Sequence, residues 1–173
     1  ADVLAGDAEP AGRLPFVVPS DPAHLPHFDR DATEITYDLF HGQWKLDRDG
    51  YAAHFPFGWG LGWGSVDVVR DELVDPSTLV VSVHHPGRRT LRPAVFAHAG
   101  IEHGEWERPA RRLVGFARAD VAPGATVDVE FDDDCYMLDV RVDGDWITEG
   151  GEYVIDVGRY AGDPEAVTVK VHR

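Results

Sequence analysis

The sequence is poor in several features that define common protein classes. Its 173 residues include one cysteine, Cys135, so an intrachain disulfide is impossible and a cysteine-based zinc site is nearly so. No apolar run approaches the ~20 residues of a transmembrane helix. Cations are also scarce, because 16 Lys and Arg stand against 31 Asp and Glu, a formal net charge of −15. Such a charge repels phosphate backbones and anionic lipids, so we expect neither a nucleic-acid nor a membrane partner.

The remaining composition is that of a folded protein. Hydrophobic residues make up 43% and charged residues 27%, which is enough apolar material for a core. The chain opens Ala1-Asp2-Val3 without Met or a basic and apolar leader, which predicts a mature product or a piece of something longer. A lone cysteine slightly favours the cytoplasm over secretion, and the compartment stays open.

The first 64 residues are rich in proline, glycine and aromatic residues and show no long periodic run. Prolines discourage helix throughout this part, at Pro10, Pro15, Pro19, Pro22, Pro26 and Pro56. We predict one strand over Arg13–Val18, ending at Pro19, and a helical turn over Asp31–Tyr37. Asp47-Arg48-Asp49-Gly50 is a turn signal, because Asx residues close turns locally and glycine adopts positive φ.

From residue 65 onward, apolar residues alternate with polar ones, which is typical of strands with one face on a core. The clearest runs are 127–131, 138–142, 153–157 and 167–171, and weaker ones are 66–69, 79–84, 94–99 and 113–119. Turn dipeptides such as Pro86-Gly87 and Pro123-Gly124 separate them. Seven or eight short strands in about a hundred residues predict a mainly β fold, a β-sandwich of the immunoglobulin or fibronectin type III kind.

Four segments also resemble, in the same order, one known family. They read ADVLAGDAEPAGRLPF (1–16), FPFGWGL (55–61), LVGFAR (113–118, followed by Pro123-Gly124) and GEYVIDVG (151–158). Together they are similar to the C-terminal portion of family 3 glycoside hydrolases, which include many bacterial and fungal β-glucosidases. The resemblance spans nearly the whole chain. It implies that residues 1–64 are the C-terminal end of an α/β-sandwich domain with its linker, and that residues 65–173 are a complete fibronectin type III-like domain.

The same resemblance implies where the catalytic groups lie. The family retains anomeric configuration, and retention needs two carboxyl groups about 5 Å apart. In the family both precede the part that this chain matches, so we assign no catalytic residue here and expect no cofactor. The chain departs from the family pattern at Gln43-Trp44, at Trp59 and at Gly62-Trp63-Gly64, which leaves the sugar subsite open.

The best candidates for contact with substrate are three tryptophans: Trp44, Trp59 and Trp63. Sugars present apolar C–H faces that stack on aromatic rings, and neighbouring glycines allow a close backbone approach. The alternative is that these rings pack one domain against the other, because large aromatics are chiefly packing material.

Two other clusters receive structural interpretations. The histidines at 84, 85, 98 and 103 are expected on strand edges rather than around a metal ion, because a metal site needs further ligands at fixed geometry. We predict that Arg108, Arg111 and Arg112 pair with acidic residues of the same protein, since no phosphate-binding glycine loop accompanies them.

These observations predict the C-terminal structural part of a retaining β-glycosidase. Its partners would be the catalytic domains, on preceding sequence or on another chain, and β-linked glycosides through that assembly. One alternative is a stand-alone module that binds polysaccharide through Trp44, Trp59 and Trp63. Another is an interaction domain that completes a split enzyme. Because a strand in the first 18 residues would lack sheet neighbours, we also expect residues 1 to about 60 to need a partner for order.

Overall fold

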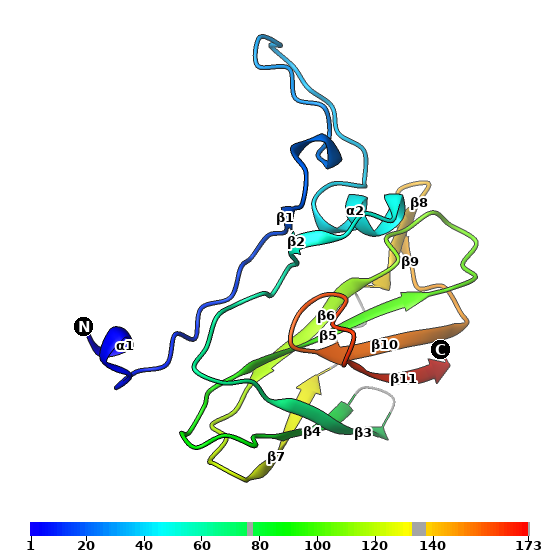
Figure 1. Cartoon of the computed structure of the whole chain (residues 1–173). Helices are drawn as coiled ribbons and strands as arrows, with labels where there is room; N and C mark the ends of the chain where they lie inside the picture. The colour runs from blue at the N-terminus through cyan, green and yellow to red at the C-terminus, as the bar shows by residue number, and fades with distance from the viewer. Residues whose placement is uncertain (76–77, 133–137, 173) are drawn as a thin grey trace.

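A computed structural model describes residues 1–75, 78–132 and 138–172 (Figure 1). Cys135 lies outside the described residues. The helical elements are α1 (Asp2–Ala5), the 3-10 turn η1 (Pro22–His24) and α2 (Gln43–Asp49). The strands are β1 (Val18–Pro19), β2 (Ala53–Phe55), β3 (Asp67–Asp75), β4 (Thr78–His84), β5 (Ala94–Ile101), β6 (Arg112–Arg118), β7 (Thr126–Asp132), β8 (Val140–Val142), β9 (Asp145–Ile147), β10 (Glu152–Gly158) and β11 (Val167–His172).

Seven of these strands form two antiparallel sheets. One sheet has the order β3-β4-β7, and the other has the order β11-β10-β5-β6. The chain crosses from the first sheet to the second between β4 and β5, returns at β7, and crosses again before β10 (Figure 1). Crossing connections of this kind are typical of Greek-key sandwiches. The predicted mainly β fold is confirmed, and each of the eight predicted runs overlaps an observed strand. For the run 138–142, only the C-terminal part, residues 140–142, lies in a strand, β8.

The core lies between the two sheets, where the alternating apolar residues meet. Val81 and Val83 of β4 and Val157 of β10 are each 0% exposed. Burying one such side chain contributes about 1.5–3 kcal/mol relative to leaving it in water. The shared core draws on six strands and on the connections between them: Val66, Leu79, Val81, Val83, Leu91, Val95, Ala97, Ala99, Val114, Val121, Val129, Leu138, Tyr153, Ile155, Val157 and Val171.

The start of β10 carries a feature found in immunoglobulin-like sandwiches. The hydroxyl of the buried Tyr153 donates a hydrogen bond of 2.7 Å to the carbonyl oxygen of Glu149, four residues upstream. A tyrosine that bonds backward in this way fixes the corner between two strands. Tyr153 therefore uses its ring in the core and its polar end to hold the turn.

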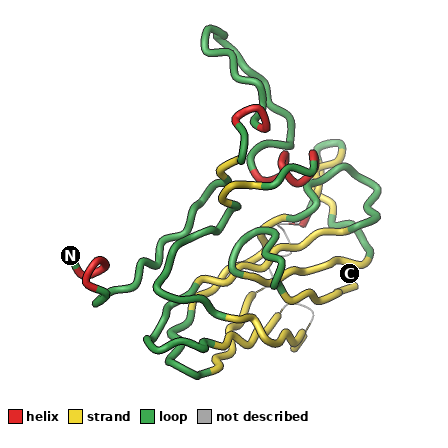
Figure 2. The backbone as a smooth tube through the Cα atoms, viewed as in Figure 1, coloured by secondary structure: helices red, strands yellow, loops and turns green. Residues whose placement is uncertain are grey.

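Residues 1–64 form an elongated segment beside the sandwich rather than a layer of their own (Figure 2). Most of the segment is loop, and its buried hydrophobic side chains are Phe40 and Leu46. With so few buried apolar groups, it cannot offset the conformational entropy of folding alone. Its order therefore depends on contact with the sandwich or with another surface.

In residues 1–64 the predicted strand over Arg13–Val18 and the predicted helical turn over Asp31–Tyr37 are wrong, and helix α2 was not predicted. Within Arg13–Val18 only Val18 belongs to a strand, because Pro15 interrupts the ladder and Leu14 bonds instead to Trp59 and Gly58 at 2.8 and 2.9 Å. Residues 31–37 hold no helical turn. The turn signal at 47–50 is instead the end of α2, where Gly50 adopts φ 72°.

Within the described ranges, no helix is both long enough and apolar enough to cross a membrane.

Candidate docking surface

The segment 55–60 attaches the N-terminal part to the outer face of the β11-β10-β5-β6 sheet. The ring of Phe57 meets Phe96 and His98 edge-on, with centroids 5.9 and 6.2 Å apart. The carbonyl oxygen of Phe57 accepts a 2.9 Å hydrogen bond from the backbone N–H of Ala161. Gly58 has φ 84°, and a Cβ there would lie 3.0 Å from the Phe96 ring. Only glycine lets the backbone pass so close to this ring in that conformation.

Helix α2 is attached by polar contacts. The Nε of Arg111 and Oδ2 of Asp47 form an ion pair of 2.9 Å. Gln43 accepts a 3.1 Å hydrogen bond from the N–H of Phe57 and donates one of 2.9 Å to Asp47. The helix, the Phe57 loop and the sandwich are thus joined through one set of side chains.

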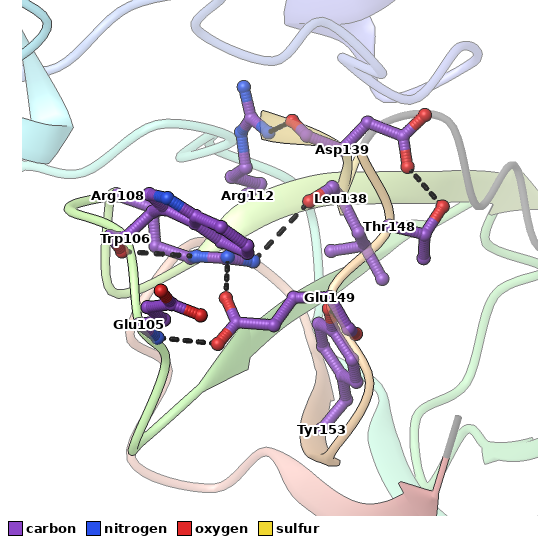
Figure 3. Close-up of polar contacts among 9 residues, drawn as sticks. All are labelled: Glu105, Trp106, Arg108, Arg112, Leu138, Asp139, Thr148, Glu149 and Tyr153. Atoms are coloured by element: carbon purple, nitrogen blue, oxygen red, sulfur yellow. Dashed lines mark hydrogen bonds and ion pairs between the residues drawn. The ribbon is translucent and has the colours of Figure 1, made fainter. Parts of the chain in front are cut away.

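The predicted internal pairing of the three arginines is confirmed for two of them by ion pairs. Arg111 pairs with Asp47, and Arg108, whose side chain is only 6% exposed, pairs with Glu149. Arg112 donates instead to the carbonyl oxygen of Asp139 at 2.7 Å. Figure 3 shows the Arg108 network, which joins the loop before β6 to the turn before β10.

An apolar cavity of about 410 Å³ lies where the N-terminal segment meets the sandwich. Its walls come from α2, from the Phe57 loop and from the coil before β1. The main apolar contributors are Phe16, Leu25, Trp44, Phe57 and Leu113. Phe16 and Leu25 are 57% and 44% exposed. Exposed apolar groups around an apolar hollow are typical of a protein–protein contact.

The three tryptophans predicted to contact substrate are not brought together. Trp44 lines the apolar cavity, with the Arg112 guanidinium 5.9 Å from its ring. Trp59 lines a different hollow and packs against Tyr160, with centroids 4.8 Å apart. Trp63 is 49% exposed and donates from its indole nitrogen to the carbonyl oxygen of Ala8 at 3.2 Å. Their contact with sugar stays a prediction.

Residues 20–39, which we name the arm, extend away from the sandwich (Figure 1). Five carboxylates of the arm stand against one arginine. Its exposed large apolar residues are Leu25, Phe28, Ile35, Tyr37 and Leu39, at 36–69% exposure. A monomer rarely displays such a group without a partner for it. The arm therefore has the chemistry of a contact surface that is apolar and acidic.

The expected placement of the histidines on strand edges is wrong for His85 and His98, because both are buried and His98 lies on the interior strand β5. Within the described residues, no group of three or more His, Cys, Asp or Glu could hold a metal ion. His85 is buried, and its Nε2 lies 2.6 Å from the carbonyl oxygen of Arg89. Burial and the nearby Arg111 lower the pKa of His98 from 6.5 to about 4, with Asp156 opposing the shift.

The buried carboxylates are already occupied by donors. Asp163 is 6% exposed, and burial by itself would raise its pKa, yet hydrogen bonds from Arg159 and from backbone N–H groups hold that pKa below its usual value. Asp139 accepts from Thr148 at 2.6 Å, and Glu149 accepts from Arg108. Retaining hydrolysis needs one carboxyl group with a raised pKa opposite an ionised one. Asp163, with its lowered pKa, does not fit the role of the acid.

Comparisons with known proteins fit this architecture. A fibronectin type III-like domain model matches residues 95–161. A β-glucosidase of Rhizobium radiobacter is 32% identical over 99% of this chain, which covers 23% of that enzyme. The thermostable β-glucosidase B of Acetivibrio thermocellus is 29% identical over 94% of the chain, again 23% of the enzyme. The chain thus spans about a quarter of the length of these relatives.

A solved structure shows the same fold over the whole chain. The β-D-glucoside glucohydrolase of Trichoderma reesei matches 99% of this chain with a TM-score of 0.89, and the chain covers 28% of it. The sequence identity is 19%, so the likeness concerns the fold. It includes residues 1–64, whose extended course is therefore shared with a known structure.

Proposed function

We propose that this chain, which corresponds to the C-terminal portion of family 3 glycoside hydrolases, is the structural part of a retaining β-glycosidase of the β-glucosidase type. Hydrolysis of terminal β-linked sugars is then a property of the assembly. The catalytic carboxylates lie on preceding sequence or on another chain. The observation that carries this proposal is a match across 99% of the chain to only 23% of a β-glucosidase.

We assign residues 1–64 to the end of an α/β domain with its linker, and residues 65–173 to the fibronectin type III-like domain. The boundary falls in the coil between β2 and β3. Two features support a docking role for the first part: the exposed apolar residues of the arm and the apolar cavity lined by Phe16 and Trp44. Catalytic domains that cover both would bury apolar surface at about 25 cal/mol per Å².

The acidic character of the arm adds a requirement for the partner. A surface that buries these side chains must also face five carboxylates, so it should carry lysine or arginine beside its apolar groups. The sandwich would hold this surface in place through Phe57, Arg111 and Asp47.

The test uses the Rhizobium radiobacter enzyme as the source of the catalytic domains. We compare four samples on an aryl β-glucoside: this chain alone, the relative truncated before the matched quarter, the two mixed, and a chimera that joins them. We expect no turnover from the chain alone, little from the truncated enzyme, and restored turnover in the mixture or the chimera.

An arm variant separates docking from general stability. Phe28→Ser and Leu39→Ser together remove exposed apolar groups without touching the core of the sandwich. We expect this variant to unfold like the unmodified chain and to restore less activity. Two results would contradict the proposal: ordinary turnover by the chain alone, or full activity of the truncated relative.

A further inference from the structure

Residues 6–14, which we name the strap, run as coil from α1 toward β1 (Figure 1). The strap begins directly after α1 and contains no helix and no strand. Its backbone carbonyl oxygens therefore have no partners within a regular element, and each needs a donor from another part of the chain or from water. Several of these donors come from the sandwich and from the linker before it.

Two arginines of the sandwich bind the backbone of the strap. Nη1 of Arg89 donates to the carbonyl oxygen of Gly6 at 2.7 Å, and Nη2 of Arg118 donates to that of Ala11 at 2.6 Å. The partners are 83 and 107 residues apart in the sequence. Both arginines are exposed, so packing in the core does not fix where their guanidinium groups lie. Charged donors form stronger hydrogen bonds than neutral ones, so these two contacts are the main polar attachment of the strap.

Between these two points the strap is held by Trp63 and Glu9. The indole nitrogen of Trp63 donates to the carbonyl oxygen of Ala8 at 3.2 Å, and the carboxylate of Glu9 accepts from the N–H of Arg92 at 2.8 Å. A Cβ at Gly62 would lie 2.9 Å from Oε1 of Glu9, so this close approach needs a residue without a side chain. The contacts along the strap thus come from the linker, from the connection between β4 and β5, and from β6.

The C-terminal end of the strap pairs with the linker. The N–H of Leu14 donates to Trp59, and its carbonyl oxygen accepts from Gly58. A Cβ at Gly60 would lie 2.5 Å from the carbonyl oxygen of Gly12, which leaves no room for the strap to move closer to the linker. The strap is therefore fixed at its end as well as along its length.

Helix α1, at the other end of the strap, displays apolar side chains. Leu4 is 89% exposed and Val3 is 41% exposed, and no residue of α1 is buried. Figure 1 shows α1 and the arm at opposite ends of the N-terminal segment. A partner held by the arm alone could rotate about that contact. A second contact at α1, at a place set by the strap, would fix its orientation, and two linked contacts strengthen each other.

We propose that the strap positions the catalytic domains against the sandwich, and that Arg89, Arg118 and Trp63 are its positioning residues. This inference rests on the proposed function, because the catalytic domains are the partner. The three side chains touch no substrate. They fix the course of the chain between α1 and β1, and they thereby fix the direction from which the arm meets the partner. Because they bind carbonyl oxygens, they do so whatever side chains the strap carries at those positions.

The first experiment measures amide exchange in the whole chain by NMR. Arg89→Met combined with Arg118→Met keeps unbranched side chains and removes both charged donors. The amides of Leu14 and Gly58 report on the strap, because both bonds break when it detaches. We expect them to exchange about tenfold faster in the double variant. The amides of β4, in the middle of its sheet, should exchange as in the unmodified chain. Trp63→Phe, which keeps a ring and loses the N–H, should act in the same direction.

The matched control is Arg141→Met combined with Lys170→Met. It removes the same two positive charges from exposed positions on β8 and β11, where Arg141 lies over Trp146 and Lys170 pairs with Glu152. This variant should leave the exchange of the strap amides unchanged. Equal exchange rates at these amides in the two double variants would show that the arginines do not hold the strap, and the inference would be wrong.

The second experiment uses the chimera with the Rhizobium radiobacter catalytic domains. The double methionine variant should lower kcat on the aryl β-glucoside about fivefold, since a misplaced domain lowers the rate from a distance. Amides of the arm should also exchange faster in that chimera, because one of two linked contacts is lost. Arg89→Lys with Arg118→Lys keeps a charged donor at each position and should recover most of the activity.

The outcomes separate the two proposals. If the methionine variant loosens the strap amides and leaves both kcat and the arm amides of the chimera unchanged, the strap has a local structural role only and the inference is overturned. If the chimera with the unmodified chain is inactive, the proposed function is overturned, and the positioning role falls with it.

Discussion

The buried ion pair between Arg159 and Asp163 should be a main support of the loop that carries the N-terminal segment. The loop packs Tyr160 against Trp59, and the N–H of Ala161 bonds to Phe57, so loosening it also loosens the segment. The side chain of Asp163 is 1% exposed and that of Arg159 is 25% exposed. The informative substitution is Asp163→Asn, which keeps the size of the side chain and removes its charge.

The magnitude follows from the four hydrogen bonds to this carboxylate. An amide can accept at one oxygen only, so the Asp163→Asn side chain cannot satisfy the two bonds made to the other oxygen, and its NH₂ group would face donors. Losing one partner of a fully buried pair costs about 3–5 kcal/mol. Because Arg159 is partly solvated and also pairs with Glu165 at 2.5 Å, the lower end applies. We expect a loss of about 3 kcal/mol, which lowers the melting temperature by about 6–12 °C in a chain of this size.

The assay is urea unfolding at neutral pH, followed by circular dichroism, with Glu165→Gln as the matched control. Glu165 is 70% exposed, and its pair with the same arginine should be worth less than about 1 kcal/mol. Amide exchange should also become faster at Ala161 in Asp163→Asn. Equal stability of the two variants, or a loss below about 1 kcal/mol in Asp163→Asn, would refute this account of the loop.

The lowered pKa of Asp163 also predicts how the stability loss in Asp163→Asn varies with pH. The pKa of Asp163 is lower in the folded state than its usual value, so its stabilising effect is complete above about pH 4. It is lost as the pH falls through the lowered pKa. The stability difference between the unmodified chain and Asp163→Asn should therefore be constant from about pH 5 to 7 and shrink below about pH 4.

Two further predictions concern the sheet face under the segment. Gly58→Ala places a side chain at φ 84° against the Phe96 ring and should lower the free energy of unfolding by about 1–3 kcal/mol. The control Gly124→Ala, at φ 70° with open space around it, should lower it by about 1 kcal/mol through backbone strain alone. Unfolding curves that show a larger loss for Gly124→Ala than for Gly58→Ala would contradict the close approach of Gly58 to Phe96. His98 has a pKa lowered to about 4, so the unfolded chain takes up its proton first and stability should fall by about 3 kcal/mol from pH 6.5 to 4. Titration of the folded His98 ring near pH 6.5 would contradict this.

Much of the sandwich could be predicted from the sequence because strand periodicity is a local property. Ile155 and Val157 point into the core while Asp156 between them points out, and no distant information is needed to see this. The resemblance of four short segments to family 3 glycoside hydrolases was likewise visible in short stretches of sequence. Because the family's catalytic groups precede the matched part, the same resemblance led us to assign no catalytic residue.

The N-terminal segment was predicted less well, because its structure is decided by what it touches. Leu14 bonds to the backbone at 58–59 rather than to a sheet neighbour, and α2 is tied to the sandwich by Asp47 and Arg111. No periodic pattern marks either contact. A seven-residue helix has weak intrinsic stability, so its sequence alone gives little signal.

Residue type and spacing along the chain were enough to predict the sandwich, the acidic charge and the family likeness. The separate surroundings of Trp44, Trp59 and Trp63, and the cavity shared by His98, Arg111 and Asp156, became visible in the folded chain alone. A cavity is formed by side chains from several strands and loops. Its chemistry depends on which of them the fold brings face to face, and that is set by packing across the sheet rather than by neighbours in sequence.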